Sequence, residues 1–196
     1  MPAVYDKYAG NYDRCFAPLE RLGLAEWRRE ALGLIPAGSR ILELGCGAGA
    51  NFAFYPLSPL AVSSELSIKM LEVAKPKLAT NHLVQADAQS LPFGEDEFDS
   101  AFATLVFCSI PDPSLAFAEA RRVLRPGGQL VLLEHVRPPG LLGPLFDGIN
   151  KISRPLFDDH FNRETLSIAL DSGFKAKKVV RKLLGVVNLM ELYSTK

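Results

Sequence analysis

The sequence predicts an α/β fold in which helices cover both faces of a mostly parallel, doubly wound sheet. Short apolar stretches alternate with helical stretches along the 196 residues, a pattern typical of parallel strands joined by crossover helices. Residues 101–106 are almost wholly apolar, as expected for a strand that is covered on both sides. The last two strands are separated only by a turn at Leu184 and Gly185, so this pair is predicted to be antiparallel.

In the N-terminal half, a helix is expected over residues 15–34. Its buried stripe is predicted to consist of Leu22, Leu24, Trp27, Ala31 and Leu34. Pro36 and Gly38 end this pattern. Three strands should follow, at residues 40–44, 60–64 and 82–86. The helix between the second and third strands is expected to begin at Ser67, which can cap it, and to end near Leu78.

The C-terminal half is expected to supply four more strands, at residues 98–106, 129–135, 175–182 and 186–193. Helices are predicted over residues 113–124 and 162–172, and Gly173 ends the second of them. Residues 137–160 are rich in Pro and Gly and should be irregular, without one continuous helix. Within them, residues 143–157 retain the spacing of a short amphipathic helix.

Composition indicates one domain over residues 1–196. The 22 Lys and Arg residues balance the 22 Asp and Glu residues, which argues against a dedicated nucleic-acid binder. The 3 cysteines have no paired spacing, so neither a disulfide framework nor a zinc site is expected, and we predict no metal. Without a membrane-spanning stretch or a signal core, the chain is expected to be cytoplasmic, with peripheral membrane contact left open.

A glycine-rich loop, Gly45-Cys46-Gly47-Ala48-Gly49, directly follows the first predicted strand. In a doubly wound sheet this is the edge where ligands bind, and glycines there allow a close approach of backbone to ligand. The spacing is GxGxG, whereas dinucleotide-binding proteins carry GxGxxG. Taken alone, the loop is equally well explained as an ordinary tight turn.

Polar residues at the ends of the next strands strengthen the ligand interpretation. Glu65 ends the second strand, where a carboxylate can accept hydrogen bonds from both hydroxyls of a ribose. Asp87 ends the third strand and can accept from an exocyclic amine such as that of adenine. Ala103 and Thr104 leave space beside them. Singly these residues could be a solvated Glu, a turn-forming Asp and plain packing, but their order along the strand ends predicts a nucleoside site.

With these motifs in place, the chain resembles the class I methyltransferases, which use S-adenosylmethionine (SAM) as methyl donor. Within that class it is similar to the methyltransferase type 11 branch, typified by ubiquinone and menaquinone biosynthesis methyltransferases. The resemblance implies a Rossmann-like, seven-stranded sheet with an antiparallel last strand. The segments that carry it are residues 41–49, 65–71, 87–93 and 124–128.

The resemblance also implies the residues that bind SAM. The N-terminal segment 5–13 is similar to an aromatic segment that closes over SAM, so residues 1–36 are predicted to form a helical lid. An exposed helix with incidental tyrosines is the alternative. The full set of predicted cofactor-binding residues is Tyr5, Tyr12, Glu43, Gly45, Cys46, Gly47, Gly49, Glu65, Leu66, Met70, Asp87, Ala88, Ala103 and Thr104.

Four further segments resemble a narrower group, the membrane-associated alkyl-thiol S-methyltransferases. That group carries an N-terminal membrane anchor, and no such anchor is expected in this chain. The chain also departs from the broader pattern, because Glu65 stands where Asp is commoner and Ser63-Ser64 replace Gly and an aliphatic residue. The four segments are residues 50–56, 104–109, 133–136 and 162–165.

The acceptor is the least determined part of the sequence interpretation. Residues 137–161 carry many apolar side chains and are predicted to form a lid over an apolar or lipid-like acceptor, such as a thiol, a quinol or a phospholipid amine. Tyr12 and His135 are the candidate catalytic residues, although a single His is more often structural. Two alternatives stay open: a catalytically silent SAM-binding subunit, and a nicotinamide-dependent oxidoreductase, for which the glycine spacing is unfavourable.

Overall fold

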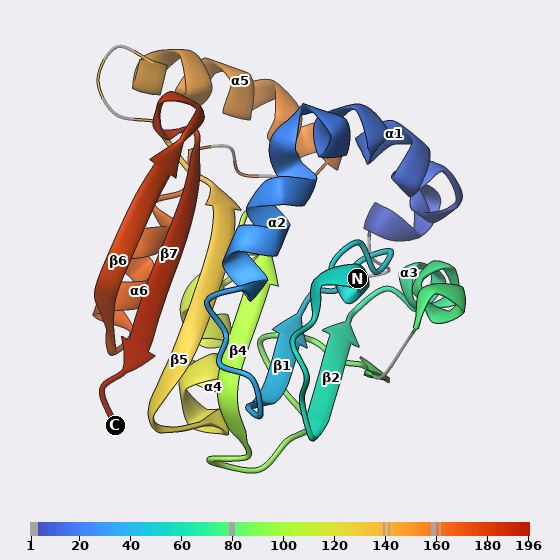
Figure 1. Ribbon diagram of the computed structural model, residues 1–196. Coiled ribbons are helices and arrows are strands. Elements are labelled where there is room, and N and C mark those ends of the chain that lie inside the picture. The colour runs from blue at the N-terminus through green and yellow to red at the C-terminus, as the bar shows by residue number, and fades with distance from the viewer. Residues whose placement is uncertain (1–3, 79–80, 139, 141, 158–159, 161) are drawn as a thin grey trace.

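The computed structural model of the protein describes residues 4–78, 81–138, 140, 142–157, 160 and 162–196, and over residues 152–157 it describes the backbone alone. These residues form one sheet with helices packed on both of its faces (Figure 1). The predicted fold class is confirmed. None of the helices in the described part combines the length and the apolar character that crossing a membrane requires.

The sheet has 7 strands in the order β3-β2-β1-β4-β5-β7-β6. Five are parallel, and β7 runs antiparallel to both β5 and β6, as the short final turn predicts. The strand order reverses between β1 and β4, so the carboxyl ends of these two strands open a crevice for ligands. The strands are β1 (Arg40–Leu44), β2 (Leu60–Glu65), β3 (His82–Gln85), β4 (Phe98–Thr104), β5 (Leu124–His135), β6 (Phe174–Lys182) and β7 (Val187–Ser194).

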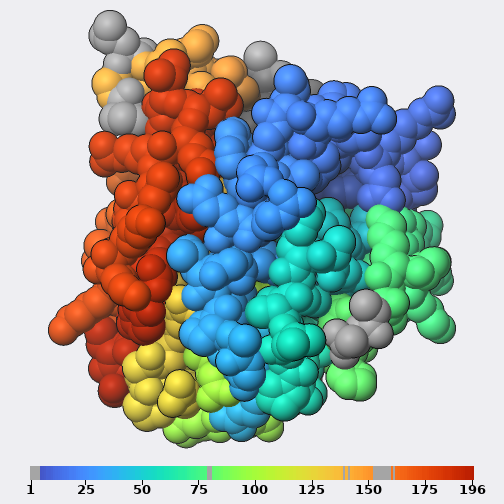
Figure 2. All heavy atoms as spheres, in the orientation of Figure 1, coloured from blue at the N-terminus to red at the C-terminus, as the bar shows by residue number. Residues whose placement is uncertain are grey.

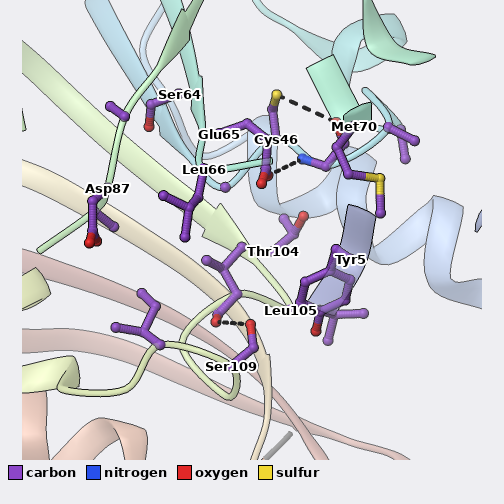
Figure 3. Close-up of a pocket in the computed structure, with 18 of the residues that line it drawn as sticks. Tyr5, Cys46, Ser64, Glu65, Leu66, Met70, Asp87, Thr104, Leu105 and Ser109 are labelled. Atoms are coloured by element: carbon purple, nitrogen blue, oxygen red, sulfur yellow. Dashed lines mark hydrogen bonds between the residues drawn. The ribbon is translucent and has the colours of Figure 1, made fainter. Parts of the chain in front are cut away.

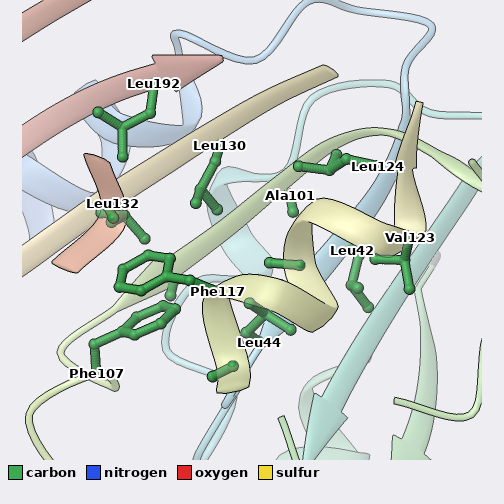
Figure 4. Packing of buried hydrophobic residues seen from close by; sticks show 14 of the residues in the cluster. Leu42, Leu44, Ala101, Phe107, Phe117, Val123, Leu124, Leu130, Leu132 and Leu192 are labelled. Carbon is green, nitrogen blue, oxygen red and sulfur yellow. The ribbon is translucent and has the colours of Figure 1, made fainter. Parts of the chain in front are cut away.

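Helices divide between the two faces of the sheet. One face is covered by α2, where Ala31 and Leu32 pack with Phe102 and Val131. The other face is covered by α4 and α6, and there Phe117 stacks on Phe107 with ring centroids 4.1 Å apart (Figure 4). The helices are α1 (Tyr12–Leu19), α2 (Ala25–Leu32), α3 (Ile68–Ala74), α4 (Pro113–Val123), α5 (Leu142–Phe157) and α6 (Thr165–Asp171).

Short helical turns join these elements. The predicted cap of α3 is confirmed, because the Ser67 hydroxyl accepts from the Met70 amide at 3.2 Å. Near the N-terminus, two 3-10 turns contact α3, and Ala9 packs with Ala48 of the glycine loop and with Met70. Figure 2 shows this blue N-terminal segment beside the green residues of α3. The turns are η1 (Val4–Lys7), η2 (Ala9–Asn11), η3 (Glu20–Leu24), η4 (Phe52–Phe54), η5 (Lys75–Lys77) and η6 (Leu183–Gly185).

The first predicted helix differs from the structure in its buried stripe. Leu22 is 79% exposed, whereas Leu24 and Ala31 are buried. The reason is η3, a π-helical turn in which Gly23 has a φ of +127°. A π turn adds a residue per turn and shifts the phase of the helix, so Leu22 rotates away from the sheet.

Residues 137–160 are more regular than their composition predicts. They contain α5, a continuous helix of 16 residues that coincides with the amphipathic stretch noted at 143–157. Pro144 lies in its first turn, where the backbone amide has no partner within the helix and proline is tolerated. Of the apolar side chains predicted to form the lid, those of Leu141, Ile152, Leu156 and Phe157 lie outside the described part of the chain.

Candidate functional site

A cavity of about 250 Å³ opens at the carboxyl ends of the central strands. Most of the residues predicted to bind the cofactor line it (Figure 3). The predicted residues found in its wall are Tyr5, Tyr12, Gly45, Cys46, Gly47, Glu65, Leu66, Met70, Asp87, Ala88 and Thr104. Glu43, Gly49, Ala103 and His135 are not among the lining residues.

The glycine loop forms one side of the cavity, and two of its glycines are there for different reasons. Gly45 has a φ of +64°, and a Cβ on it would lie 2.6 Å from Val106 Cγ1. Gly47 has a φ of +52°, and a Cβ on it would meet no atom within 4 Å. The first glycine is therefore required by packing inside the protein. The second leaves open space against the cavity, which a ligand can fill.

Glu65 fixes the glycine loop and faces the cavity. Its Oε2 accepts from the Gly47 amide at 2.9 Å, and its Oε1 accepts from the Ser67 amide at 2.9 Å. Each oxygen keeps a lone pair for a further donor. Burial raises the pKa of Glu65, and the amides of Ser67 and Gly47 oppose this shift.

Asp87 lies further along the same wall (Figure 3). One of its oxygens accepts from the Gln89 amide at 2.8 Å, which orients the carboxylate at the end of its strand. Glu65 and Asp87 thus place two hydrogen-bond acceptors along one side of the cavity, as the sequence interpretation requires for a ribose and a base.

Two tyrosines from the N-terminal segment reach the cavity. The ring centroids of Tyr5 and Tyr12 are 6.4 Å apart, and both rings pack with Ala9, Ala48 and Met70. The Ser67 hydroxyl donates to Asp6, which ties this segment to the start of α3. Burial raises the pKa of Tyr12 to about 12. At neutral pH its phenol is therefore protonated and can donate a hydrogen bond, but it is a poor base.

The predicted residues outside the wall support the cavity from behind. Glu43 is fully buried and accepts from Asn51 Nδ2 at 2.6 Å and from the Tyr55 hydroxyl at 2.5 Å. Burial raises the pKa of Glu43, with these donors opposing the shift. A Cβ on Gly49 would lie 2.6 Å from the ring of Phe52, and Ala103 belongs to the core.

Arg28 is a cavity residue that the sequence interpretation did not identify. It lies on α2, is only 4% exposed and lines the cavity. Its Nη1 donates to Asn51 Oδ1 at 3.0 Å and to the Thr104 hydroxyl, while Nε donates to Glu20 Oε1 at 3.1 Å. One signal was available, because a cation here interrupts the buried stripe between Leu24 and Ala31.

The opposite side of the cavity is formed by residues 105–111, which also went unidentified. Their side chains in the wall are mostly apolar, namely Leu105, Val106, Ser109, Ile110 and Pro111. Leu105 adopts a left-handed conformation with a φ of +59°, which ends β4 two residues earlier than predicted. Below, residues 105–111 are called the acceptor wall.

The lining residues fit SAM. Carboxylate acceptors suit its ribose and adenine, the Arg28 guanidinium suits its carboxylate, and the aromatic lid suits its sulfonium. The open space beside Gly47 is what a ligand against the loop would require. Within the described residues, no group of three or more His, Cys, Asp or Glu residues is placed to hold a metal ion.

Comparisons with known proteins agree with this fit. Residues 42–132 match a family described as a methyltransferase domain. The chain is similar to the demethylmenaquinone methyltransferase of Renibacterium salmoninarum, with 32% identity over 142 residues that cover 70% of this chain and 60% of that protein. It is also similar to the thiol S-methyltransferase TMT1B of Homo sapiens, with 37% identity over 116 residues that cover 55% of this chain and 48% of that protein.

The chain thus spans 48% to 60% of the length of these two curated relatives. In structure it is similar to a SAM-dependent methyltransferase of Thermotoga maritima, with a TM-score of 0.73 and 20% identity over 98% of both chains. At this identity the likeness shows the fold.

Proposed function

Since this chain carries a methyltransferase domain of the SAM-dependent class, we propose that it transfers the methyl group of SAM to a small apolar thiol or quinol. The match of residues 42–132 to a methyltransferase domain confirms, over that part of the chain, the family predicted from the sequence. The observation that carries the acceptor class is the acceptor wall, where Leu105, Val106, Ile110 and Pro111 face the cavity. The names of the two relatives, which act on a quinone precursor and on thiols, support the same classes.

We assign the ribose of SAM to Glu65, its adenine to Asp87 and Ala88, and its carboxylate to Arg28. SAM supplies an electrophilic methyl group on a positively charged sulfur. The chain's own part is to hold that group in line with the acceptor and to exclude water, which the lid tyrosines Tyr5 and Tyr12 would do.

The acceptor wall presents no strong base to the cavity, since Ser109 is the one polar side chain that it contributes to the lining and the thiol of Cys108 is buried outside it. Tyr12 stays protonated at neutral pH, and His135 does not line the cavity. A catalytic base is not needed where a small ionised fraction of the acceptor is nucleophilic enough to react. Thiols fit this description, because the thiolate is intrinsically very nucleophilic, and this favours them over phospholipid amines.

The test is a product assay with labelled SAM across thiols, quinols, phenols and phospholipid amines. We expect methylated product and S-adenosylhomocysteine (SAH) with apolar thiols or quinols. Product with phospholipid amines alone would contradict the acceptor class. SAH binding without any product would favour the silent-subunit alternative.

The segment predicted to form the acceptor lid presents apolar side chains outward on α5, which supports a peripheral contact with a membrane surface. On α5, Leu145 is 58% exposed and Ile149 is 39% exposed, one turn apart on the same face. At the turn between β6 and β7, Leu183 and Leu184 are 63% and 84% exposed and both have positive φ. Figures 1 and 2 show this turn and α5 at the same end of the molecule. An apolar acceptor dissolved in a bilayer would be reached from such a surface.

A further inference from the structure

We infer that Glu134 and Arg163 are positioning residues that set the shape of the acceptor wall and thereby the choice of acceptor. The inference rests on the proposed function, because it assigns a specificity role within the same cavity. Neither side chain lines the cavity itself. Both act on the backbone of the wall from behind, and they come from segments far apart in the sequence.

Glu134 holds the amide side of the wall. It lies near the end of β5, is fully buried, and its Oε1 accepts from the Val106 amide at 2.9 Å and from the Phe107 amide at 3.2 Å. One carboxyl oxygen therefore fixes two consecutive peptide units of the wall.

Arg163 holds the carbonyl side of the same segment. Its Nη1 donates to the Ile110 carbonyl at 2.6 Å and also to the Phe107 carbonyl. The backbone nearby adds a third tie, because the His160 amide donates to the Cys108 carbonyl at 3.0 Å. A planar guanidinium that bridges two carbonyls restricts both their distance and their orientation.

The wall needs this restraint because it begins with a strained residue. Leu105 has a φ of +59°, a left-handed conformation that is unfavourable for a non-glycine residue and persists only where the surroundings over-determine it. The Leu105 amide donates to the Leu133 carbonyl at 2.8 Å, which adds to the bonds from Glu134. Strained backbone of this kind is concentrated at ligand sites.

Further hydrogen bonds connect the segment that contains Arg163 to α5. Asp147 on α5 accepts from Arg137 Nη2 at 2.9 Å and from Asn162 Nδ2 at 3.2 Å. Asn162 precedes Arg163 directly, so α5 and the acceptor wall are held by neighbouring side chains.

If the side chain at position 134 served only to stabilise the fold, an apolar residue would be expected there. A buried carboxylate is costly to desolvate, and an apolar side chain of the same size is often as stable. What Glu134 provides and an apolar residue cannot is a fixed backbone shape at a cavity. Arg122 offers a matched comparison, because it donates to the Phe93 carbonyl at 2.7 Å and to the Leu91 carbonyl at 3.1 Å, and neither of these two residues lines the cavity.

The experiment compares Glu134→Met and Arg163→Met with Glu134→Gln, Arg163→Lys and the control Arg122→Met. For each variant, kcat/KM is measured with a short and a long acceptor, butanethiol and decanethiol, or a short-chain and a long-chain demethylmenaquinol if the wild-type protein methylates quinols. The ratio of the two values does not depend on the fraction of active protein. Thermal unfolding and SAH binding are measured alongside.

Glu134→Met and Arg163→Met should each change the ratio about tenfold, the effect of losing roughly one net hydrogen bond. Glu134→Gln retains an acceptor oxygen and should stay within about threefold. Arg122→Met should lower the unfolding temperature and leave the ratio unchanged. An unchanged ratio in both Met variants would overturn the inference while the proposed function stands. Absence of product from the wild-type protein would overturn both.

Discussion

Removal of the Glu65 carboxylate tests the cofactor assignment most directly. In Glu65→Ala, the ligand loses its hydrogen bonds to a charged acceptor, worth about 1.5–3 kcal/mol. This corresponds to a weakening of SAH binding by about 10- to 140-fold. The amides of Gly47 and Ser67, which donate to this carboxylate at 2.9 Å, also lose their partner, so the free protein should unfold at a lower temperature.

The assay is calorimetric titration with SAH, with Glu119→Ala as the control. Glu119 likewise accepts from a backbone amide, that of Leu91 at 2.8 Å, but it does not line the cavity. Its removal should lower the unfolding temperature and spare SAH affinity. If Glu65→Ala binds SAH as tightly as the wild-type protein does, the assignment of the ribose to Glu65 is wrong.

Two further predictions concern pH and the outward leucines. Burial raises the pKa of Glu65 above its ordinary value of 4.5, so SAH binding should weaken as the pH falls through that raised pKa, and Glu65→Gln should remove this dependence. The folding stability of the free protein depends on pH in the opposite sense. The folded state holds this proton more tightly than the unfolded state does, so the stabilisation is lost as the pH rises through the raised pKa. For the membrane surface, Leu183→Ser with Leu184→Ser should reduce binding to phosphatidylglycerol vesicles by about tenfold or more, since each buried Leu contributes about 1.5–3 kcal/mol. Leu57→Ser, which changes a leucine of 86% exposure near the opposite end of the sheet, should have no effect, and an equal loss would contradict the assigned surface.

The sequence predicted those parts of the site that depend on residues close together in the chain. The glycine loop and Glu65 each lie at the end of a strand, and parallel strands bring their carboxyl ends to one edge. The cap at Ser67 depends on residues within one turn, and so it too was predictable. Because each signal needs only its neighbours and the topology, the cofactor side of the cavity followed from the motifs.

Other parts depend on contacts between distant residues, which periodicity does not reveal. Arg28 reaches the cavity only because Asn51 and Thr104, 23 and 76 residues away, accept its hydrogen bonds. The exposure of Leu22 depends on the π-helical turn around Gly23, which the spacing of apolar residues does not show. The continuity of α5 was underestimated because Pro144 was counted as a breaker, although its place in the first turn makes it compatible with a helix.

The acceptor wall explains why three segments that looked unrelated resembled one narrow group. Residues 104–109 contain most of the wall, residues 133–136 contain Glu134, and residues 162–165 contain Arg163, and the structure joins them by hydrogen bonds. The motifs at Gly45, Glu65 and Asp87 instead surround the cofactor side. Under the proposed function, similarity in the first set concerns the acceptor, and similarity in the second concerns SAM. A relative that shares only the cofactor motifs should share the methyl donor but not the acceptor, and exchanging residues 104–109 alone should fail to transfer specificity, because the wall takes its shape from the other two segments.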